Sequence, residues 1–217
     1  MEVKYYTEPF KLDKIPLDAI HVIDNWCPQD MWQTFAEQVD NTGRWNFNNN
    51  VTWDDVGTTE VTWMMPLYGK WMKPYDTYSL MAKPIIERMC SDFGVEFKQF
   101  DYAGLNGQTK GLQGTIHKDN YRRKNLSFLW HINPEWGDRW KGAFRVYKKD
   151  ALDKGQRGFS DRLVQEWQIA EIQYKPNRLI IMDGSYPHSA DAPGLESGFT
   201  LRKTMVVFGN VVELVDN

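Results

Sequence analysis

The sequence has few of the features that mark secreted or membrane-spanning proteins. Its 217 residues include only two cysteines, Cys27 and Cys90, which is too few for a disulfide framework and fits a reducing compartment. No run approaches the roughly 18 apolar residues of a membrane-spanning helix. Residues 1–18 also lack the charged and then apolar pattern of a signal peptide. We therefore expect a cytoplasmic protein without a membrane partner.

The chain also has no excess of positive charge. The formal net charge is −3, whereas broad nucleic-acid binding needs a strongly basic surface, so we expect no nucleic-acid partner. The one basic run is residues 122–124 (Arg-Arg-Lys). It is interpreted as a solvated loop, with steering of an acidic cosubstrate as the alternative.

Hydrophobic periodicity predicts helices in the first part of the chain. After a short strand at 19–24, apolar residues within 31–39 recur at spacings of three and four, which is typical of an amphipathic helix. A second helix is predicted from about residue 76 to residue 92. Gly94 supplies its stop signal, and Pro84 should kink it or begin a new helix.

Strand-like runs dominate the rest of the chain, and turns separate them without helical spacers. The runs are 96–102, 125–132, 143–147, 167–173, 178–182 and 199–208. This pattern favours an antiparallel sandwich or open barrel over repeated βαβ units. No repeat or linker marks a boundary, so we predict a mainly β single domain over 1–217, with helical support about 1–95 and a β core about 96–210.

The chain has only four histidines, and one of them, His117, precedes Asp119 by two positions in "GTIHKDN". On a strand these two side chains share a face and can bind one ion. Alone the pair is weak evidence, because acidic residues are common in the chain. His188, at the end of another predicted strand, offers a third ligand. Two imidazoles and one carboxylate form the facial triad of non-haem Fe(II) oxygenases.

An arginine follows the third candidate ligand on the next predicted strand. Arg202 lies 14 residues after His188, in "FTLRKTMVVF", and alternates with apolar residues. If its side chain points inward, it needs an anion, and a carboxylate matches the guanidinium fork.

The ordered set His117-x-Asp119, His188 and Arg202 resembles the 2-oxoglutarate/Fe(II)-dependent oxygenases, specifically their prolyl-4-hydroxylase-like branch. The similarity is good over about residues 97–210 and looser in the N-terminal third. Three flanking segments carry it: "IHVIDNWCPQDMWQTFAEQV" (20–39), "FLWHINPEWGDRWKGAFRVYKK" (128–149) and "YKPNRLIIMDGSYPHSADAP" (174–193).

The resemblance implies a double-stranded β-helix, or jelly roll, on which we expect the N-terminal helices to pack against one sheet. It also implies an Fe(2+) ion bound by His117, Asp119 and His188. No further catalytic residue is implied beyond this metal centre. An ion held in this way keeps open positions for 2-oxoglutarate and O2.

The same resemblance assigns contacts to 2-oxoglutarate. Arg202 corresponds to the residue that pairs with its distal carboxylate. His131 stands where many relatives have a tyrosine that also bonds this carboxylate. Tyr102 and Asn106, before the metal pair, are further candidates for cosubstrate binding.

The implied activity is hydroxylation of a prolyl residue of a protein, or of a small amino-acid-like molecule, with release of succinate and CO2. One open alternative is a cupin-like or jelly-roll metal-binding protein without oxygenase activity. Others are a β-sandwich binding module with structural histidines and a zinc hydrolase that uses the same triad. Arg202 argues against the hydrolase, which needs no anchor for a dicarboxylate.

Overall fold

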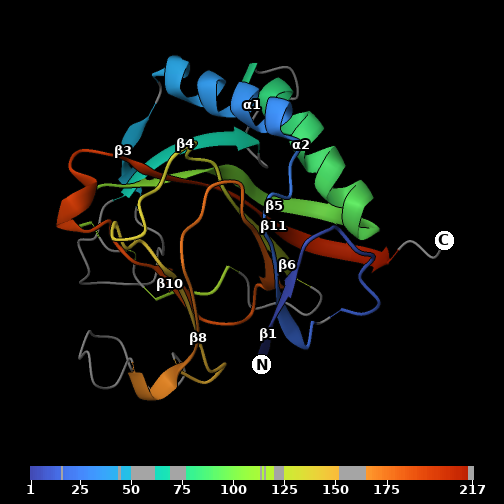
Figure 1. The fold of residues 1–217 in the computed structure, drawn as a ribbon. Helices are drawn as coiled ribbons and strands as arrows, with labels where there is room; N and C mark the ends of the chain where they lie inside the picture. The colour runs from blue at the N-terminus through green and yellow to red at the C-terminus, as the bar shows by residue number, and fades with distance from the viewer. Residues whose placement is uncertain are drawn as a thin grey trace.

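The computed structural model describes residues 1–15, 17–43, 45–49, 62–68, 77–112, 114, 116–119, 125–151 and 165–214. The basic run at 122–124 lies outside these residues. The described part is mainly β, with one large mixed sheet, one small sheet and few helices, which confirms the predicted class at this level (Figure 1).

The large sheet has eight strands and is antiparallel except at one edge, where β1 and β2 run parallel. In spatial order its strands are β1 (Glu2–Tyr6), β2 (Ala19–Ile23), β9 (Leu179–Asp183), β6 (Asn125–His131), β11 (Arg202–Leu214), β5 (Val95–Gln108), β4 (Thr62–Tyr68) and β3 (Asn46–Asn49). Strands distant in sequence are therefore neighbours in the middle of the sheet.

The small sheet is antiparallel and has three strands. Their order is β10 (His188–Ala190), β7 (Phe144–Tyr147) and β8 (Gln168–Ile172). An isolated antiparallel bridge between His117 and His188 continues this sheet beyond β10. This bridge brings the segment that follows β5 against the small sheet.

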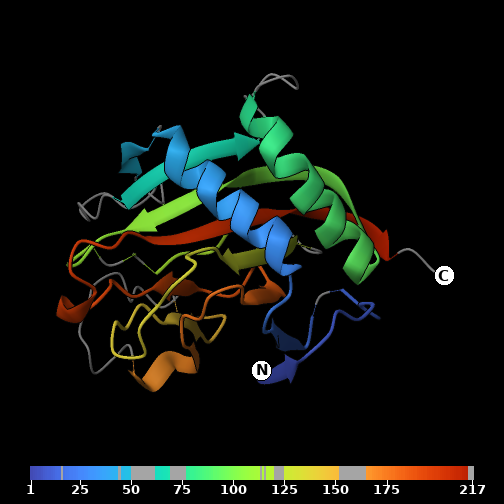
Figure 2. The same ribbon diagram turned by 45° about the horizontal axis from the view of Figure 1, so that its top comes forward.

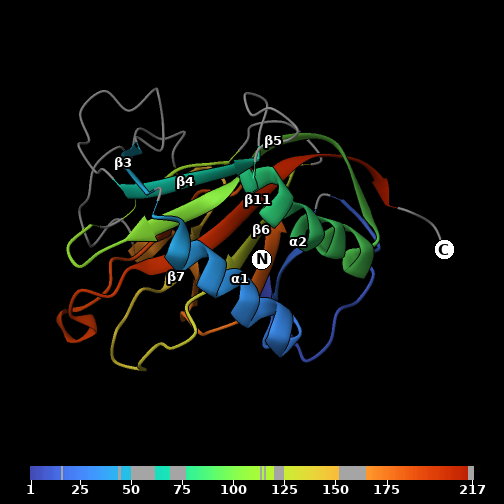
Figure 3. The same ribbon diagram turned by 90° about the horizontal axis from the view of Figure 1, so that it is seen from above.

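Two helices lie over one face of the large sheet, as the three views agree (Figures 1, 2 and 3). In α1 (Gln29–Thr42), the buried residues recur at helical spacing, and the helix ends at Gly43 in a left-handed conformation (φ 61°). In α2 (Thr77–Phe93), Pro84 lies inside one continuous helix, so no new helix begins there. Within the described ranges, neither helix has the length and apolar content needed to cross a lipid bilayer.

Strand β6 is buried on both faces and separates two hydrophobic clusters. Leu126, Phe128 and Trp130 belong to the cluster that also contains the buried residues of α1 and α2. Leu129 points the other way and packs with Phe144 of the small sheet. Side chains on this second face of the large sheet therefore meet the small sheet.

The predicted strands of the β core are present, with shifts at their ends. The prediction placed the strand after Gly94 at 96–102, whereas β5 continues to Gln108. The short strands β1 and β10 were not predicted. The extension of β5 and the presence of β10 both matter for the site, because they carry residues that line it.

Candidate metal centre and its cavity

The structure brings His117, Asp119 and His188 together, as the sequence predicted. The two histidines face each other in the isolated bridge. The backbone N–H of His117 donates to the His188 carbonyl at 3.0 Å, and that of His188 donates to the His117 carbonyl at 2.8 Å. The bridge holds their imidazole rings side by side, with centroids 4.4 Å apart.

One ligand atom from each of the three side chains lies within 4.8 Å of the other two. Asp119 Oδ1 is 3.7 Å from His117 Nε2 and 3.4 Å from His188 Nε2. Two atoms that bind one ion at about 2.1 Å lie roughly 3.0–3.5 Å apart, so both distances to the carboxylate are close to those of a shared ion. The donor set therefore fits a divalent transition metal.

Neighbouring groups hold two of the three ligands in the orientation that metal binding requires. Ser127 Oγ donates to Asp119 Oδ2 at 2.6 Å, which leaves Oδ1 facing the imidazoles. The Nδ1 of His188 lies 2.9 Å from the Tyr186 carbonyl. Because a carbonyl only accepts, Nδ1 carries the proton and Nε2 keeps its lone pair for an ion.

Gly184 lies beside Asp119 at a position where a side chain would not fit. The N–H of Asp119 donates to the Gly184 carbonyl at 3.1 Å. A Cβ at position 184 would lie 2.6 Å from Ser127 Oγ and 2.1 Å from Asn125 Oδ1. Glycine at this position therefore allows the hydroxyl of Ser127 to reach the carboxylate.

Electrostatics keep the carboxylate charged. Burial by itself would raise the pKa of Asp119, but the imidazoles of His188 and His117 outweigh it and hold the pKa well below the usual range. Burial lowers the pKa of His188, and the Asp119 carboxylate more than reverses this, so the pKa lies above its ordinary value. A cation between the three groups would supply the positive charge that the carboxylate attracts.

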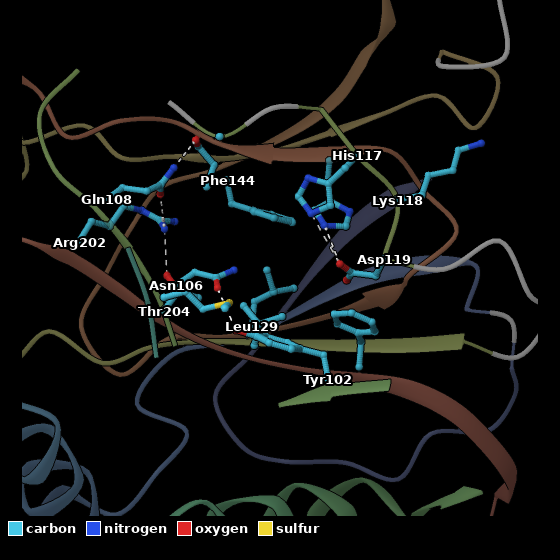
Figure 4. Close-up of a pocket in the computed structure, with 16 residues that line it drawn as sticks. Tyr102, Asn106, Gln108, His117, Lys118, Asp119, Leu129, Phe144, Arg202 and Thr204 are labelled. Carbon is cyan, nitrogen blue, oxygen red and sulfur yellow. Dashed lines mark hydrogen bonds and ion pairs between the residues drawn. The ribbon is translucent and has the colours of Figure 1, made fainter. Parts of the chain in front are cut away.

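The three groups open onto a cavity of about 190 Å³ between the two sheets. Its described lining comprises Met64, Tyr102, Asn106, Gln108, Gly114, His117, Lys118, Asp119, Leu129, Phe144, His188, Ala190, Arg202, Thr204, Val206 and Phe208. Figure 4 shows the His117–Asp119 pair on one side of the cavity and Arg202 with Gln108 on the opposite side. The cavity therefore has a candidate metal centre at one end and a cation at the other.

Arg202, the first residue of β11, points inward and is 2% exposed. Its Nε donates to the Gly142 carbonyl at 2.8 Å, and its Nη1 donates to Gln108 Oε1 at 3.0 Å and to Thr204 Oγ1 at 2.9 Å. Its Cζ lies 4.8 Å from the centre of the Tyr174 ring. These contacts fix the plane of the guanidinium and occupy Nε and Nη1.

All four of these partners of Arg202 are electrically neutral. Asp191, which acts on the guanidinium through space, is already bonded to Arg145 at 2.8 Å. Burial lowers the pKa of Arg202 to about 10, so the group stays charged at neutral pH. The cavity thus ends in a buried positive charge for which the described residues supply no ion pair.

Tyr102 and Asn106, both predicted as site residues, also line the cavity. They lie on β5, and Tyr102 Oη donates to Asn106 Oδ1 at 3.2 Å. The Tyr102 ring occupies the space over Gly104, because a Cβ there would lie 2.2 Å from Tyr102 Oη. Burial raises the pKa of Tyr102, so its hydroxyl stays protonated and able to donate.

His131 does not line the cavity, although the sequence analysis placed it beside Arg202. Its ring stacks on Tyr174, with centroids 4.0 Å apart and planes at 12°. Tyr174 in turn provides the ring that faces the guanidinium of Arg202. The histidine is therefore covered by a residue from a distant segment, which the sequence did not indicate.

Two solved structures share the architecture of this chain. One is the crystal structure of a Pseudomonas putida prolyl-4-hydroxylase, which matches over 88% of this chain and 92% of its own, with a TM-score of 0.55 and 15% identity. The other is a Trichoplax adhaerens prolyl hydroxylase in complex with a hypoxia inducible factor oxygen degradation domain peptide fragment. It matches over 87% of this chain and 82% of its own, with a TM-score of 0.54 and 14% identity. The chain shares its overall fold with these two proteins.

No protein-family model matches the chain, and no curated protein matches it significantly by sequence. At identities near 15%, a structural match establishes the fold and not the chemistry. The function therefore has to be argued from the site residues themselves.

Sequence reasoning missed three polar residues of the site: Ser127, Gln108 and Thr204. For Thr204 a signal was present, because it lies two residues after Arg202 and so shares its face of β11. Ser127 stands out as a polar residue inside the apolar run of β6. Gln108 gave no signal, since the predicted strand ended before it.

Proposed function

We propose that this protein is a non-haem Fe(II)- and 2-oxoglutarate-dependent oxygenase built as one domain. The proposal depends on one observation: a single cavity has a candidate metal site at one end and a buried positive charge at the other. The His117–Asp119–His188 triad lies at one end, and the buried, charge-unpaired Arg202 lies at the other. A ligand with a chelating group and a distant carboxylate satisfies both ends, and 2-oxoglutarate has this form.

Fe(II) is the ion that the triad favours, because two imidazoles and one carboxylate on one face leave coordination positions open. When bound, the ion supplies the oxidative chemistry that couples decarboxylation of 2-oxoglutarate to hydroxylation of a substrate. The chain contributes orientation. Ser127 and Tyr186 hold Asp119 and His188 in place, while apolar residues such as Leu129 and Phe144 exclude water from the cavity.

Arg202 is the anchor for the distal carboxylate in this proposal. Thr204 Oγ1 accepts from the guanidinium, so its own hydroxyl proton can be donated to the same carboxylate. Tyr102 and Asn106 line the cavity and are assigned contacts to the cosubstrate. His131 is assigned no direct contact, because it is absent from the described lining of the cavity.

We favour a protein substrate, such as a prolyl residue of a polypeptide, over a small molecule. Pockets that enclose a whole small molecule measure roughly 300–1,000 Å³, and this cavity measures about 190 Å³. A cavity of this size does not enclose the cosubstrate and a second whole molecule, which favours a substrate that projects one group into it, such as a side chain of a polypeptide. A relative of the same fold was solved with a peptide fragment, which supports a protein substrate over a small amino-acid-like molecule.

Conversion of 2-oxoglutarate to succinate, followed by mass spectrometry, tests the proposal. We expect slow succinate formation that needs both Fe(II) and O2, even without the protein substrate. The Asp119→Ala variant, which lacks the only anionic ligand, serves as the matched control and should form none. Turnover that persists under anaerobic conditions would exclude an oxygenase.

A further inference from the structure

Gln108 joins the two sheets at the anchor end of the cavity. It is the last residue of β5 and is 3% exposed. Its Oε1 accepts from Arg202 Nη1 at 3.0 Å, and its Nε2 donates to the Ala190 carbonyl at 2.9 Å (Figure 4). Because a guanidinium only donates and a carbonyl only accepts, the carboxamide has a single possible orientation.

The second partner of Gln108 lies on a strand that leads from the anchor end to the metal end of the cavity. Arg202 is the anchor, whereas Ala190 ends β10, the strand that begins with the metal ligand His188. The Ala190 carbonyl also accepts the N–H of Gly114 at 2.9 Å, three residues before His117. Gln108 therefore ties the guanidinium to both segments that supply the imidazoles.

This junction is tightly packed. A Cβ at position 114 would lie 3.2 Å from the Ala190 carbonyl oxygen and 3.3 Å from Gln108 Nε2. The close contact restricts movement of the carboxamide against β10. The distance between the anchor and the metal centre is therefore fixed by direct hydrogen bonds and not by the sheets alone.

The chemical identity of Gln108 matters as much as its position. A glutamine holds Arg202 through a hydrogen bond without neutralising it. A carboxylate at the same place would form an ion pair with the guanidinium and compete with any anion that enters the cavity. The amide therefore orients the anchor and leaves its charge available to a ligand.

We propose that Gln108 is a positioning residue that sets the length of the dianionic 2-oxo acid accepted by the cavity. The proposal rests on the function proposed above and adds a determinant of specificity to it. A fixed anchor discriminates between 2-oxoglutarate and 2-oxoadipate, which has one more methylene. Such a difference changes affinity about 10- to 200-fold in a fitted site.

Calorimetric titration of the two acids into the Mn(II)-loaded protein tests this proposal. The wild type should bind 2-oxoglutarate roughly tenfold or more tightly than 2-oxoadipate. In Gln108→Met, which keeps the length of the side chain but loses both hydrogen bonds, the ratio should fall to about threefold or less as the anchor moves. In Gln108→Glu, both acids should lose roughly thirtyfold or more in affinity, because the new carboxylate occupies Arg202.

Two controls separate positioning from loss of structure. Gln33→Glu makes the same chemical change on the exposed side of α1 and should bind both acids as the wild type does. The dissociation constant for Mn(II), measured before each acid titration, should be unchanged in all variants, because no metal ligand is altered.

Several outcomes would overturn the proposal. One is a Gln108→Met variant that keeps the wild-type ratio, and another is a Gln108→Glu variant that binds 2-oxoglutarate at wild-type affinity. Loss of Mn(II) binding in both variants would show that Gln108 maintains the fold instead. Failure of the wild type itself to bind either acid, with Mn(II) bound normally, would overturn the proposed function and this inference together.

Discussion

Replacing Arg202 by alanine should separate ligand binding from folding. In the ligand-free protein, the change leaves the Gly142 carbonyl and Gln108 Oε1 without their donor, at a cost of about 1–3 kcal/mol each. It also removes a buried charge that no described carboxylate neutralises, which offsets much of that cost. We therefore expect a net loss in the free energy of unfolding of about 1–2 kcal/mol, well below the stability of a typical domain.

The effect of Arg202→Ala on 2-oxoglutarate should be larger than its effect on folding. Truncating one partner of a buried charge pair costs about 2–5 kcal/mol. Thr204 and the other polar lining remain, so we expect the lower part of this range, about 2–4 kcal/mol. This corresponds to a dissociation constant raised roughly thirty- to a thousandfold. Arg202→Lys keeps the charge but loses the planar fork, so it should fall in between.

Calorimetric titration of 2-oxoglutarate into Mn(II)-loaded wild type and variants measures this effect. Arg139, whose side chain is 86% exposed, gives the matched control, and Arg139→Ala should bind the acid as the wild type does. Mn(II) affinity should stay constant throughout, because the anchor is not a metal ligand. Equal 2-oxoglutarate affinity in wild type and Arg202→Ala would refute the role of Arg202 and leave only the triad to support the cosubstrate.

Three further predictions concern the metal centre and the covered histidine. Asp119→Ala and His117→Ala should each weaken Mn(II) binding tenfold or more, since even the loss of a residue that only orients a metal ligand lowers metal affinity roughly 10- to 100-fold. If both variants bind one Mn(II) ion with unchanged affinity, the metal site is assigned to the wrong residues. Ser127→Ala removes the 2.6 Å bond to Asp119 and should weaken Mn(II) binding about tenfold. A Ser127→Ala variant that binds Mn(II) as the wild type does would contradict the role of the hydroxyl. His131→Ala should lower the thermal midpoint of unfolding, because it removes the ring that stacks on Tyr174. It should change the dissociation constant for 2-oxoglutarate by about threefold or less. A tenfold loss of 2-oxoglutarate affinity at full Mn(II) occupancy would show that His131 contacts the cosubstrate.

The metal triad could be predicted because its signal is local. His117 and Asp119 keep the two-residue spacing of a strand, although the structure places them in an isolated bridge and the bend after it. His188 follows an apolar strand that is easy to recognise, so its place at a sheet end was also predictable. These patterns depend on backbone periodicity, which a sequence displays directly.

The anchor end was harder to predict because it depends on contacts between distant segments. The predicted strand ended at residue 102, yet β5 continues through Gly104 and Gly107 to Gln108. Gly104 leaves space for the Tyr102 ring, and a Cβ at Gly107 would lie 2.9 Å from the Trp45 ring. The glycines allow close packing here, and Gln108 lies beyond the point where the prediction stopped.

The place of His131 was also hard to predict, because it too depends on contacts between distant segments. Its position on β6 is correct, and it faces the same side of the strand as Leu129, which lines the cavity. Its ring stacks on Tyr174, whose hydroxyl lies 2.6 Å from both Asn133 Oδ1 and the Lys203 carbonyl, so these two acceptors share its single proton. That buried arrangement joins three segments, and periodicity within one segment does not reveal it.

The most direct test is a crystal structure with Mn(II) and an inert analogue of 2-oxoglutarate, with the ion located by anomalous scattering. The account predicts one ion among His117, Asp119 and His188. It also predicts one analogue molecule that reaches from the ion to Arg202, with its distal carboxylate within hydrogen-bond distance of the guanidinium and of Thr204 Oγ1. An ion bound elsewhere, or an analogue whose distal carboxylate points away from Arg202, would contradict the claim that the two ends of this cavity hold a single cosubstrate.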